Sequence, residues 1–314
     1  MERPLVSIQC LVYNHGAYLK KCLDGIVMQK TTFKFEVIIH DDASADNSVS
    51  IIEEYVQRYP DIIKVILEKE NRYSKCDGSL HKMMHEASLG KYIALCEGDD
   101  YWIDPLKLQK QIDFLEEHDE CTFSCHCYNV YREDNQKLYS VQKEYFRLHP
   151  DATHFFFDRR YLFLKDFVAQ TLTCVYRKDS LEISVCEKFK YYRDTHLFYF
   201  LLNKGIGVCH SFIGGVYRVN PYSIYGSKDC KERIKIGYNV YYEFYSIAKD
   251  PILKKVLEHQ CYGLILSHQC SVLHWDFWVM KIWLKLPLFV LNRICIKIKN
   301  YGTKYITFNT MSCI

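Results

Sequence analysis

Two clusters of acidic residues stand directly after apolar runs that are typical of strands. One cluster spans Asp41–Asp46 and follows the run 35–40, and the other spans Glu97–Asp100 and follows the run 91–96. In an open parallel sheet, such positions lie at the carboxyl edge, where ligands bind. Carboxylates there suit a hard divalent cation that carries a diphosphate, because Mg²⁺ prefers one or two protein carboxylates together with phosphate oxygens. The clusters therefore predict a nucleotide-linked substrate.

Apolar spacing predicts alternating strands and helices over residues 1–118. Short apolar runs bounded by turn residues predict strands, at 5–12, 35–40, 62–67 and 91–96. Apolar residues between them recur at helical spacing, near 18–27, 49–59 and 80–88. This alternation predicts an α/β fold with a Rossmann-like, mostly parallel sheet that is flanked by helices.

The rest of the chain is less regular. Residues 119–233 mix strand and loop patterns, and we expect them to complete a cleft as the second half of the same domain. Residues 234–314 show helical spacing and predict a C-terminal helical extension. Within this extension, Trp275–Ile298 sets aromatic and aliphatic residues among sparse basic ones. Two interpretations stay open for this tail. It is either a helix that lies in a membrane interface or a helical layer that packs on the preceding domain and exposes its basic residues to solvent.

Composition limits the partners and the compartment. The chain has 314 residues, with 41 Lys and Arg against 38 Asp and Glu, so its overall charge does not indicate a nucleic-acid partner. Its 15 cysteines include no CxxC pair, and we interpret them as reduced, mostly buried thiols. The N-terminus shows no signal-peptide pattern, and no apolar run reaches the ~18 residues of a membrane span. We therefore expect a cytoplasmic protein, with peripheral contact to the inner face of the membrane if the tail is interfacial.

Four segments, in this order, resemble the family 2 glycosyltransferases. They are Val6–Asn14, Asp41–Asp46, Glu97–Trp102 and Tyr217–Val219. The resemblance implies a GT-A fold and transfer of a sugar from a nucleotide diphosphate donor. It also implies that residues 1–118 bind the donor and residues 119–233 bind the acceptor.

The resemblance assigns a donor pocket to the first two segments. Leu11, Val12, Tyr13 and Asn14 would form its base and ribose edge, with Tyr13 as the stacking surface. Asp42 would accept a hydrogen bond from a base N–H, which favours uracil and hence a UDP-sugar.

The resemblance also implies a divalent metal, Mg²⁺ or Mn²⁺, at the second acidic cluster. Asp99 would lie near the ribose or the metal, and Asp100 would bind the metal directly. A bound cation neutralises the charge that builds up as a nucleoside diphosphate departs. Arg218 either approaches the diphosphate or forms a structural ion pair. Asn220 stands where many relatives have a histidine, which puts metal binding from that loop in doubt.

Inversion at the anomeric carbon needs a base for the acceptor hydroxyl. The family places an acidic residue at the start of a helix there, and Asp194 matches it. The same position fits a helix N-cap, and one residue can serve in both ways.

These assignments predict an inverting, metal-dependent glycosyltransferase. Its acceptor would be a hydroxyl of a saccharide or a lipid-linked saccharide, in polysaccharide or glycolipid biosynthesis. The alternatives are a nucleotidyltransferase on a similar sheet and a non-catalytic module that binds nucleotides or sugars.

Other polar residues have simpler interpretations. His81 and His85 are one helical turn apart but favour a helix surface over a zinc site, and the crowded Cys121–Cys127 favours core thiols. Asp41 either caps its loop or contacts the ligand, and Asp46 is interpreted as an N-cap.

Overall fold

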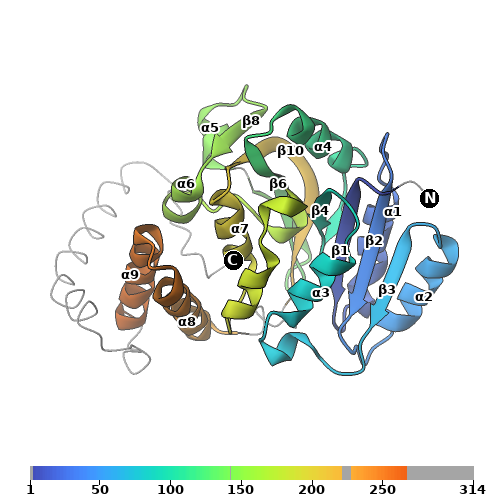
Figure 1. Ribbon diagram of the computed structural model, residues 1–314, viewed down its shortest axis with the longest axis horizontal. Helices are drawn as coiled ribbons and strands as arrows, with labels where there is room; N and C mark the ends of the chain where they lie inside the picture. Colours follow the sequence, from blue (N-terminus) through green and yellow to red (C-terminus); the bar gives the residue numbers. More distant parts are fainter. Residues whose placement is uncertain (1–2, 142, 221–227, 267–314) are drawn as a thin grey trace. The chain divides into compact units, whose positions relative to one another are not determined.

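The computed structural model describes residues 3–141, 143–220 and 228–266. The chain divides into two compact units, Met1–Pro221 and Tyr222–Ile314. The first unit is built on one mixed sheet (Figure 1). The described part of the second is helical.

The first unit contains the strands, and the main path of its sheet runs in the order β3-β2-β1-β4-β9-β6-β10-β5. β7 pairs with β6, and β8 pairs with β10. The strands are β1 (Val6–Val12), β2 (Phe35–Asp41), β3 (Ile63–Leu67), β4 (Tyr92–Leu95), β5 (Tyr101–Trp102), β6 (Cys121–Arg132), β7 (Lys137–Val141), β8 (His154–Phe157), β9 (Val175–Arg177) and β10 (Ile206–Val219).

Helices of the first unit connect these strands. The α-helices are α1 (Gly16–Val27), α2 (Ser48–Arg58), α3 (Ser79–Ala87), α4 (Lys107–Glu117), α5 (Glu144–Leu148), α6 (Arg159–Leu164) and α7 (Asp194–Leu202). Short 3₁₀ turns are η1 (Tyr73–Lys75), η2 (Thr171–Thr173), η3 (Lys178–Ser180) and η4 (Ile183–Lys188).

The N-terminal strands form the parallel part of the sheet. β1 pairs in parallel with both β2 and β4, and β2 pairs in parallel with β3. Figure 1 shows β1, β2 and β3 side by side. Because side chains alternate along a strand, Val37 and Ile39 join the large core cluster with α1 and α2, whereas Ile38 packs with Leu80 and Met84 of α3. Both faces of the sheet are therefore covered, as the apolar strand patterns predict.

The later strands complete the sheet mostly by antiparallel pairing. β9 pairs antiparallel with β4 and β6, and β5 pairs antiparallel with β10. β10 runs parallel to β6, with register shifts along its length. This strand ends at Val219, so it brings the Tyr217–Val219 segment to the region after β4, where β5 begins.

The second unit contains α8 (Cys230–Ala248) and α9 (Pro251–Leu266), which pack on each other. Asp229 caps α8, because its side chain accepts a hydrogen bond from the Glu232 amide at 2.7 Å. No helix in the described ranges is both long and apolar enough to cross a membrane. The tail Trp275–Ile298 lies outside these ranges, so both interpretations of it remain predictions.

The order of elements over the first 118 residues confirms the predicted strand–helix alternation. The predicted helical character also holds for the described residues after 234. The assignment of a donor half and an acceptor half on either side of residue 118 remains a prediction.

We predict opposite effects of alanine at two helical glycines. A Cβ at Gly25 of α1 would lie 2.6 Å from the Trp102 carbonyl oxygen of β5, whereas a Cβ at Gly263 of α9 would meet only Ile234 Cγ2 at 3.4 Å. Gly25→Ala should therefore destabilise the protein by about 1–3 kcal/mol. Gly263→Ala should stabilise it by about 0.4–1 kcal/mol, because alanine loses less chain entropy on folding. Urea unfolding measures both, and a Gly25→Ala protein as stable as the parent would contradict the close packing of α1 on β5.

Candidate active site

The carboxyl ends of β1, β2 and β4 meet at one edge of the sheet. The Asp42 amide donates to the Val12 carbonyl at 2.9 Å, and the Gly98 amide donates to the Leu11 carbonyl at 2.9 Å. The two acidic clusters thus flank the segment Leu11–Asn14, as the sequence predicts. Val12 itself points into the core, whereas the Tyr13 side chain is 40% exposed and is the aromatic surface available to a ligand.

The first cluster is largely structural. Asp41 Oδ1 accepts the Ser44 amide at 2.9 Å, so this carboxylate caps its loop. Asp46 accepts the amides of Gly16 and Ser48 at 2.8 and 2.9 Å. Burial would raise the pKa of Asp46, but these hydrogen bonds outweigh it and lower that pKa. Asp46 is not the N-cap of α2, because the capping position is Asn47; instead, its carboxylate ties α1 to α2.

Asp42 fixes a neighbouring loop. Its side chain is only 3% exposed, and its two oxygens accept the amides of Arg72 and Tyr73 at 2.6 and 3.0 Å. The Tyr73 hydroxyl in turn accepts a hydrogen bond from Arg193 at 3.1 Å, just before α7. Asp42 therefore positions the Tyr73 loop against the second half of the unit. A carboxylate oxygen accepts more than one hydrogen bond, so these contacts leave acceptor capacity on Asp42, and its contact with a base remains a prediction.

The second cluster follows β4, and it is buried at Asp100 and half-buried at Glu97 and Asp99. Asp100 is 2% exposed, and its Oδ1 accepts the Arg218 backbone amide at 2.7 Å. Burial, together with the charges of Asp99 and Glu97, raises the pKa of Asp100 well above that of an ordinary aspartate. Glu97 accepts a hydrogen bond from the Thr171 hydroxyl, yet burial and the charges of Asp99 and Asp194 raise its pKa to about 7.

Asp194 is the first residue of α7 and joins this group electrostatically. Its negative charge contributes to the raised pKa of Glu97, so the two carboxylates lie near enough to repel each other. Burial raises the pKa of Asp194 itself, against the lowering effects of the Thr195 amide and of Arg193. The N-cap position belongs to Arg193, so the interpretation of Asp194 as the cap is wrong. Its carboxylate instead accepts the amide of the next residue, Thr195, at 2.8 Å.

Arg218 holds the acidic loop together through its backbone and its side chain. Its Nε donates to the Asp99 carbonyl at 2.8 Å, and its Nη1 pairs with Glu133. The guanidinium is also 4.7 Å from the ring centre of Tyr18, a cation–π contact. The side chain is only 8% exposed, so the geometry favours the structural ion pair over a direct grip on a diphosphate. Asn220, two residues further on, is buried as well.

The carboxylates of the second cluster fit a divalent cation that takes only some of its ligands from the protein and the others from a bound phosphate. In the described part of the chain, no three His, Cys, Asp or Glu side chains are arranged to hold a metal by themselves. Asp99 and Asp100 nevertheless carry carboxylate oxygens, the hard donor type that such a cation would need, at a place where the carboxylates repel one another. One or two carboxylates completed by phosphate oxygens is the mode in which Mg²⁺ binds. Mn²⁺ takes similar oxygen ligands.

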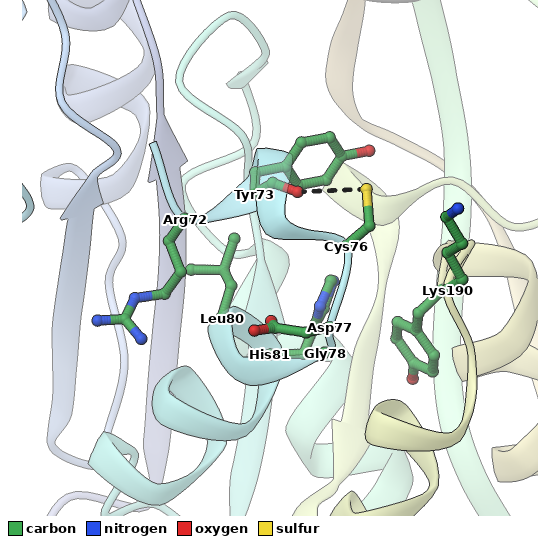
Figure 2. A pocket seen from close by; sticks show the side chains of 9 residues that line it. Arg72, Tyr73, Cys76, Asp77, Gly78, Leu80, His81 and Lys190 are labelled. Carbon is green, nitrogen blue, oxygen red and sulfur yellow. Dashed lines mark hydrogen bonds between the residues drawn. The ribbon is translucent and has the colours of Figure 1, made fainter. Parts of the chain in front are cut away.

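A small cavity lies beside the Tyr73 loop. Its volume is about 30 Å³, and Arg72, Tyr73, His81 and Lys190 are among the residues that line it. Figure 2 shows Cys76 in this loop, with its Sγ 3.7 Å from the Tyr73 carbonyl oxygen. The cavity has room for about one water molecule and not for a sugar. The His81 ring packs edge-on against Tyr192, with 4.7 Å between the ring centres, so the predicted position on an open helix surface is wrong.

Several positioning residues were missed at the sequence level. The Thr171 hydroxyl of η2 donates a hydrogen bond to Glu97, and Arg193 donates one to the Tyr73 hydroxyl. Neither pair has a local signal, because each joins segments that are far apart in the chain. The core-thiol interpretation is confirmed, since Cys121, Cys125 and Cys127 are buried free thiols that form no disulfide.

The chain belongs to glycosyl transferase family 2. The family model matches residues 7–183, which is more than half of the chain. The match covers β1 to β4 and both acidic clusters, and it ends before Asp194 of α7 and Arg218 of β10.

Curated relatives share the N-terminal part of this chain. Uncharacterized protein Rv1520 of Mycobacterium tuberculosis is 45% identical over 132 residues, which are 42% of this chain and 37% of the relative. TuaG of Bacillus subtilis, whose name assigns it to teichuronic acid biosynthesis, is 31% identical over 136 residues, or 43% of this chain and 51% of TuaG. The chain thus aligns with about half or less of the length of these relatives.

Solved structures show that the fold is GT-A. TarS of Staphylococcus aureus, solved with UDP-GlcNAc, matches with a TM-score of 0.60 and 16% identity over 90% of this chain and 79% of that one. The mannosyltransferase PcManGT of Pyrobaculum calidifontis, solved with GDP-Man and Mn²⁺, matches with a TM-score of 0.55 and 14% identity over 97% of this chain and 89% of that one. This confirms the predicted fold class.

We predict that the buried amine of Lys107 lowers the stability of the protein at neutral pH. Lys107 is fully buried below Trp102, its Nζ is 3.9 Å from the ring centre, and within the described ranges this amine has no hydrogen-bond partner. Burial lowers its pKa to about 7. Between pH 7 and about 10.4 the unfolded chain therefore holds a proton that the folded chain lacks, so the stability contributed by this group rises with pH.

Lys107→Met should raise the free energy of unfolding by about 1–4 kcal/mol at pH 7, with a gain that shrinks toward pH 10. Lys110→Met is the matched control on the same helix, because Lys110 is largely exposed and pairs with Asp104. Its effect should be within about 1 kcal/mol, without that pH trend. Urea unfolding of the variants across this pH range measures the difference. A Lys107→Met protein that is less stable than the parent at pH 7 would show that the amine is well accommodated.

Proposed function

We propose that this protein is an inverting, metal-dependent glycosyltransferase that moves a sugar from a nucleotide diphosphate donor to a hydroxyl acceptor. The observation that carries the proposal is the convergence of Glu97, Asp99 and Asp100 after β4 with Asp194 at the start of α7. Carboxylates that are partly removed from water and repel one another are costly for the fold. A site for a cation-bound diphosphate and for a general base accounts for Asp99, Asp100 and Asp194.

The donor binds along the carboxyl edge of the sheet. Tyr13 stacks on the base, and Leu11, Asn14 and the backbone of Val12 border the base and the ribose. Asn14 supports this edge because it has a left-handed φ of 55° and its side-chain oxygen accepts the Ala45 amide at 2.8 Å. The proposed base is uracil, contacted by Asp42. The fold neighbours leave a guanine donor as the competing outcome, since TarS was solved with UDP-GlcNAc and PcManGT with GDP-Man.

Asp99 and Asp100 would hold the divalent cation together with diphosphate oxygens. When bound, such a cation neutralises the charge that develops on the departing nucleoside diphosphate. Hydrogen bonds from Arg218 hold these two residues in position for this role. The Arg218 amide fixes Asp100, and the Arg218 side chain fixes the backbone at Asp99.

Asp194 acts as the general base. It removes the proton from the acceptor hydroxyl while the hydroxyl oxygen forms a bond to the anomeric carbon. The bond from that carbon to the diphosphate breaks from the opposite face, which inverts the configuration. The raised pKa of Asp194 suits this role, because a base works best when its pKa lies closer to the working pH.

The acceptor is a saccharide or a lipid-linked saccharide, and the pathway is the assembly of a cell-surface polysaccharide or glycolipid. The similarity to TuaG, named for teichuronic acid biosynthesis, supports this class of product. The acceptor half would comprise residues 119–233.

We predict that Asp100→Asn loses metal-dependent nucleotide binding. Calorimetric titration of UDP and of GDP with Mn²⁺ should give binding that EDTA weakens and that the variant weakens by at least about tenfold, since a charged metal ligand is lost. Asp113→Asn is the control, because this carboxylate is exposed on α4 and accepts a hydrogen bond from Gln109 of the same helix. Nucleotide affinity that is equal with Mn²⁺, with EDTA and in Asp100→Asn would contradict the metal site. Binding of GDP alone would reassign the base.

Asp194→Asn should separate chemistry from binding. Turnover of UDP-GlcNAc and other UDP-sugars, measured as nucleoside diphosphate release with simple glycosides as acceptors, should fall by about 10²–10⁴-fold. UDP affinity should stay within about twofold, because Asp194 contributes no donor contact in this account. Release of pyrophosphate instead would indicate a nucleotidyltransferase.

The pH profile gives a second readout of the same residue. Turnover of the parent should be lost as the pH falls through the pKa of Asp194, because only the carboxylate accepts a proton. Burial raises this pKa, so the acid limb should lie above the value of about 3.9 for a free aspartate. A profile that is flat down to pH 4, or an Asp194→Asn variant with full turnover, would exclude Asp194 as the base.

A further inference from the structure

A basic groove lies at the opposite end of the parallel strands. It is lined by residues just before β1, β2 and β4, together with parts of α3 and of the segment after β9, and its volume is about 840 Å³. This volume falls in the range of pockets that hold small-molecule ligands, about 300–1,000 Å³. The groove carries the charged side chains Arg3, Lys34, Lys91, Lys178 and Asp179. Four cations against one carboxylate make it strongly basic.

Two of these cations are held next to each other by the backbone. Lys178 Nζ donates to the Ser88 carbonyl at 2.5 Å, and Arg3 Nε donates to the Leu89 carbonyl at 2.6 Å. These carbonyls directly follow α3, where the helix dipole favours positive charge. Gly90 allows this arrangement, because a Cβ there would lie 2.6 Å from the Ser7 amide nitrogen of β1. The turn between α3 and β4 thus presses against β1 and fixes both cations in the groove.

Nearby carboxylates do not neutralise this pair. Glu36 is the acidic neighbour of Lys178, but its oxygens already accept hydrogen bonds from Ser7, the Leu89 amide and Lys64. Glu116 pairs with Lys91 instead. Across the described ranges, neither Arg3 nor Lys178 forms an ion pair. The two charges repel each other, and after burial the charge of Arg3 is the main cause that lowers the pKa of Lys178.

The groove is also separate from the donor site. It opens before the first residue of β1, whereas the proposed donor edge follows the last residue of the same strand. A strand of seven residues spans about 23 Å at ~3.3 Å per residue. A nucleotide donor bound at the carboxyl edge cannot reach this far, so any ligand of the groove is a second molecule or a distant part of a long acceptor.

We propose that the basic groove binds phosphate groups of a ligand other than the nucleotide donor. Arg3 and Lys178 supply adjacent charge-assisted donors, and Lys34 and Lys91 line the same opening. Phosphate oxygens suit such a pair because one dianionic group neutralises both charges. The volume admits more than one phosphate, as in a soluble phosphate-rich chain or the headgroup of an anionic lipid. This inference does not depend on the proposed transferase activity.

The test measures binding of inorganic tripolyphosphate and of vesicles made from equal amounts of phosphatidylglycerol and phosphatidylcholine. It uses the full chain with Asp100→Asn as the background and EDTA present, so that the proposed donor site does not contribute. Arg3→Gln/Lys178→Gln removes both charges and keeps side-chain N–H donors for the Ser88 and Leu89 carbonyls. Lys137→Gln/Lys204→Gln is the matched control, because these lysines are exposed and lie outside the groove.

The groove variant should bind at least one probe about tenfold or more weakly than the control, and binding by the control should weaken with added salt. Loss of tripolyphosphate binding indicates a soluble phosphate ligand, and loss of vesicle binding indicates a lipid headgroup. Thermal unfolding of the double variant verifies that it folds. Arg3→Gln alone is a second variant, which removes only one of the two charges. The proposal is overturned if neither probe binds at low salt, or if the groove and control variants bind both probes equally.

Discussion

Mutual repulsion among the carboxylates that follow β4 and begin α7 is the constraint around which this molecule is organised. Glu97, Asp99 and Asp100 follow one strand and repel one another, and the charge of Asp194 at the start of α7 acts on Glu97. Burial alone would favour their neutral forms. The fold counters this with fixed donors, the Arg218 amide and the Thr171 hydroxyl, which hold the carboxylates in place without neutralising them. A site with excess negative charge and fixed geometry is preorganised for a cation.

The mixed sheet explains how these residues meet. Its parallel part gathers the ends of β1, β2 and β4 at one edge, and its antiparallel extension carries β10 back to the same region. Hydrogen bonds between segments that are distant in the sequence then join the parts of the unit, among them the bond between Tyr73 and Arg193. The opposite edge of the same strands gathers basic residues. One scaffold thus separates an acidic edge from a basic one.

The sequence predicts the parallel half well because its signals are local. Apolar runs mark the strands, helical spacing marks the connections, and each acidic cluster stands at a strand end. Asp194 at the start of α7 also follows from a local pattern, although its neighbour Arg193 takes the N-cap position. Arg218 shows what local sequence patterns do not predict. Its sequence segment resembles a ligand-binding motif, but its contacts with Glu133 and the Asp99 carbonyl depend on pairing across the sheet. No periodicity encodes such contacts.

The central claim is that Asp99 and Asp100 hold a divalent cation on the donor diphosphate. The most direct test is a crystal structure of the protein with UDP and Mn²⁺, with the metal located by its anomalous scattering. The account predicts one strong anomalous peak within about 2.0–2.6 Å of a carboxylate oxygen of Asp100 and of a diphosphate oxygen. A diphosphate bound at this edge without a metal, or a metal bound away from both aspartates, would contradict it.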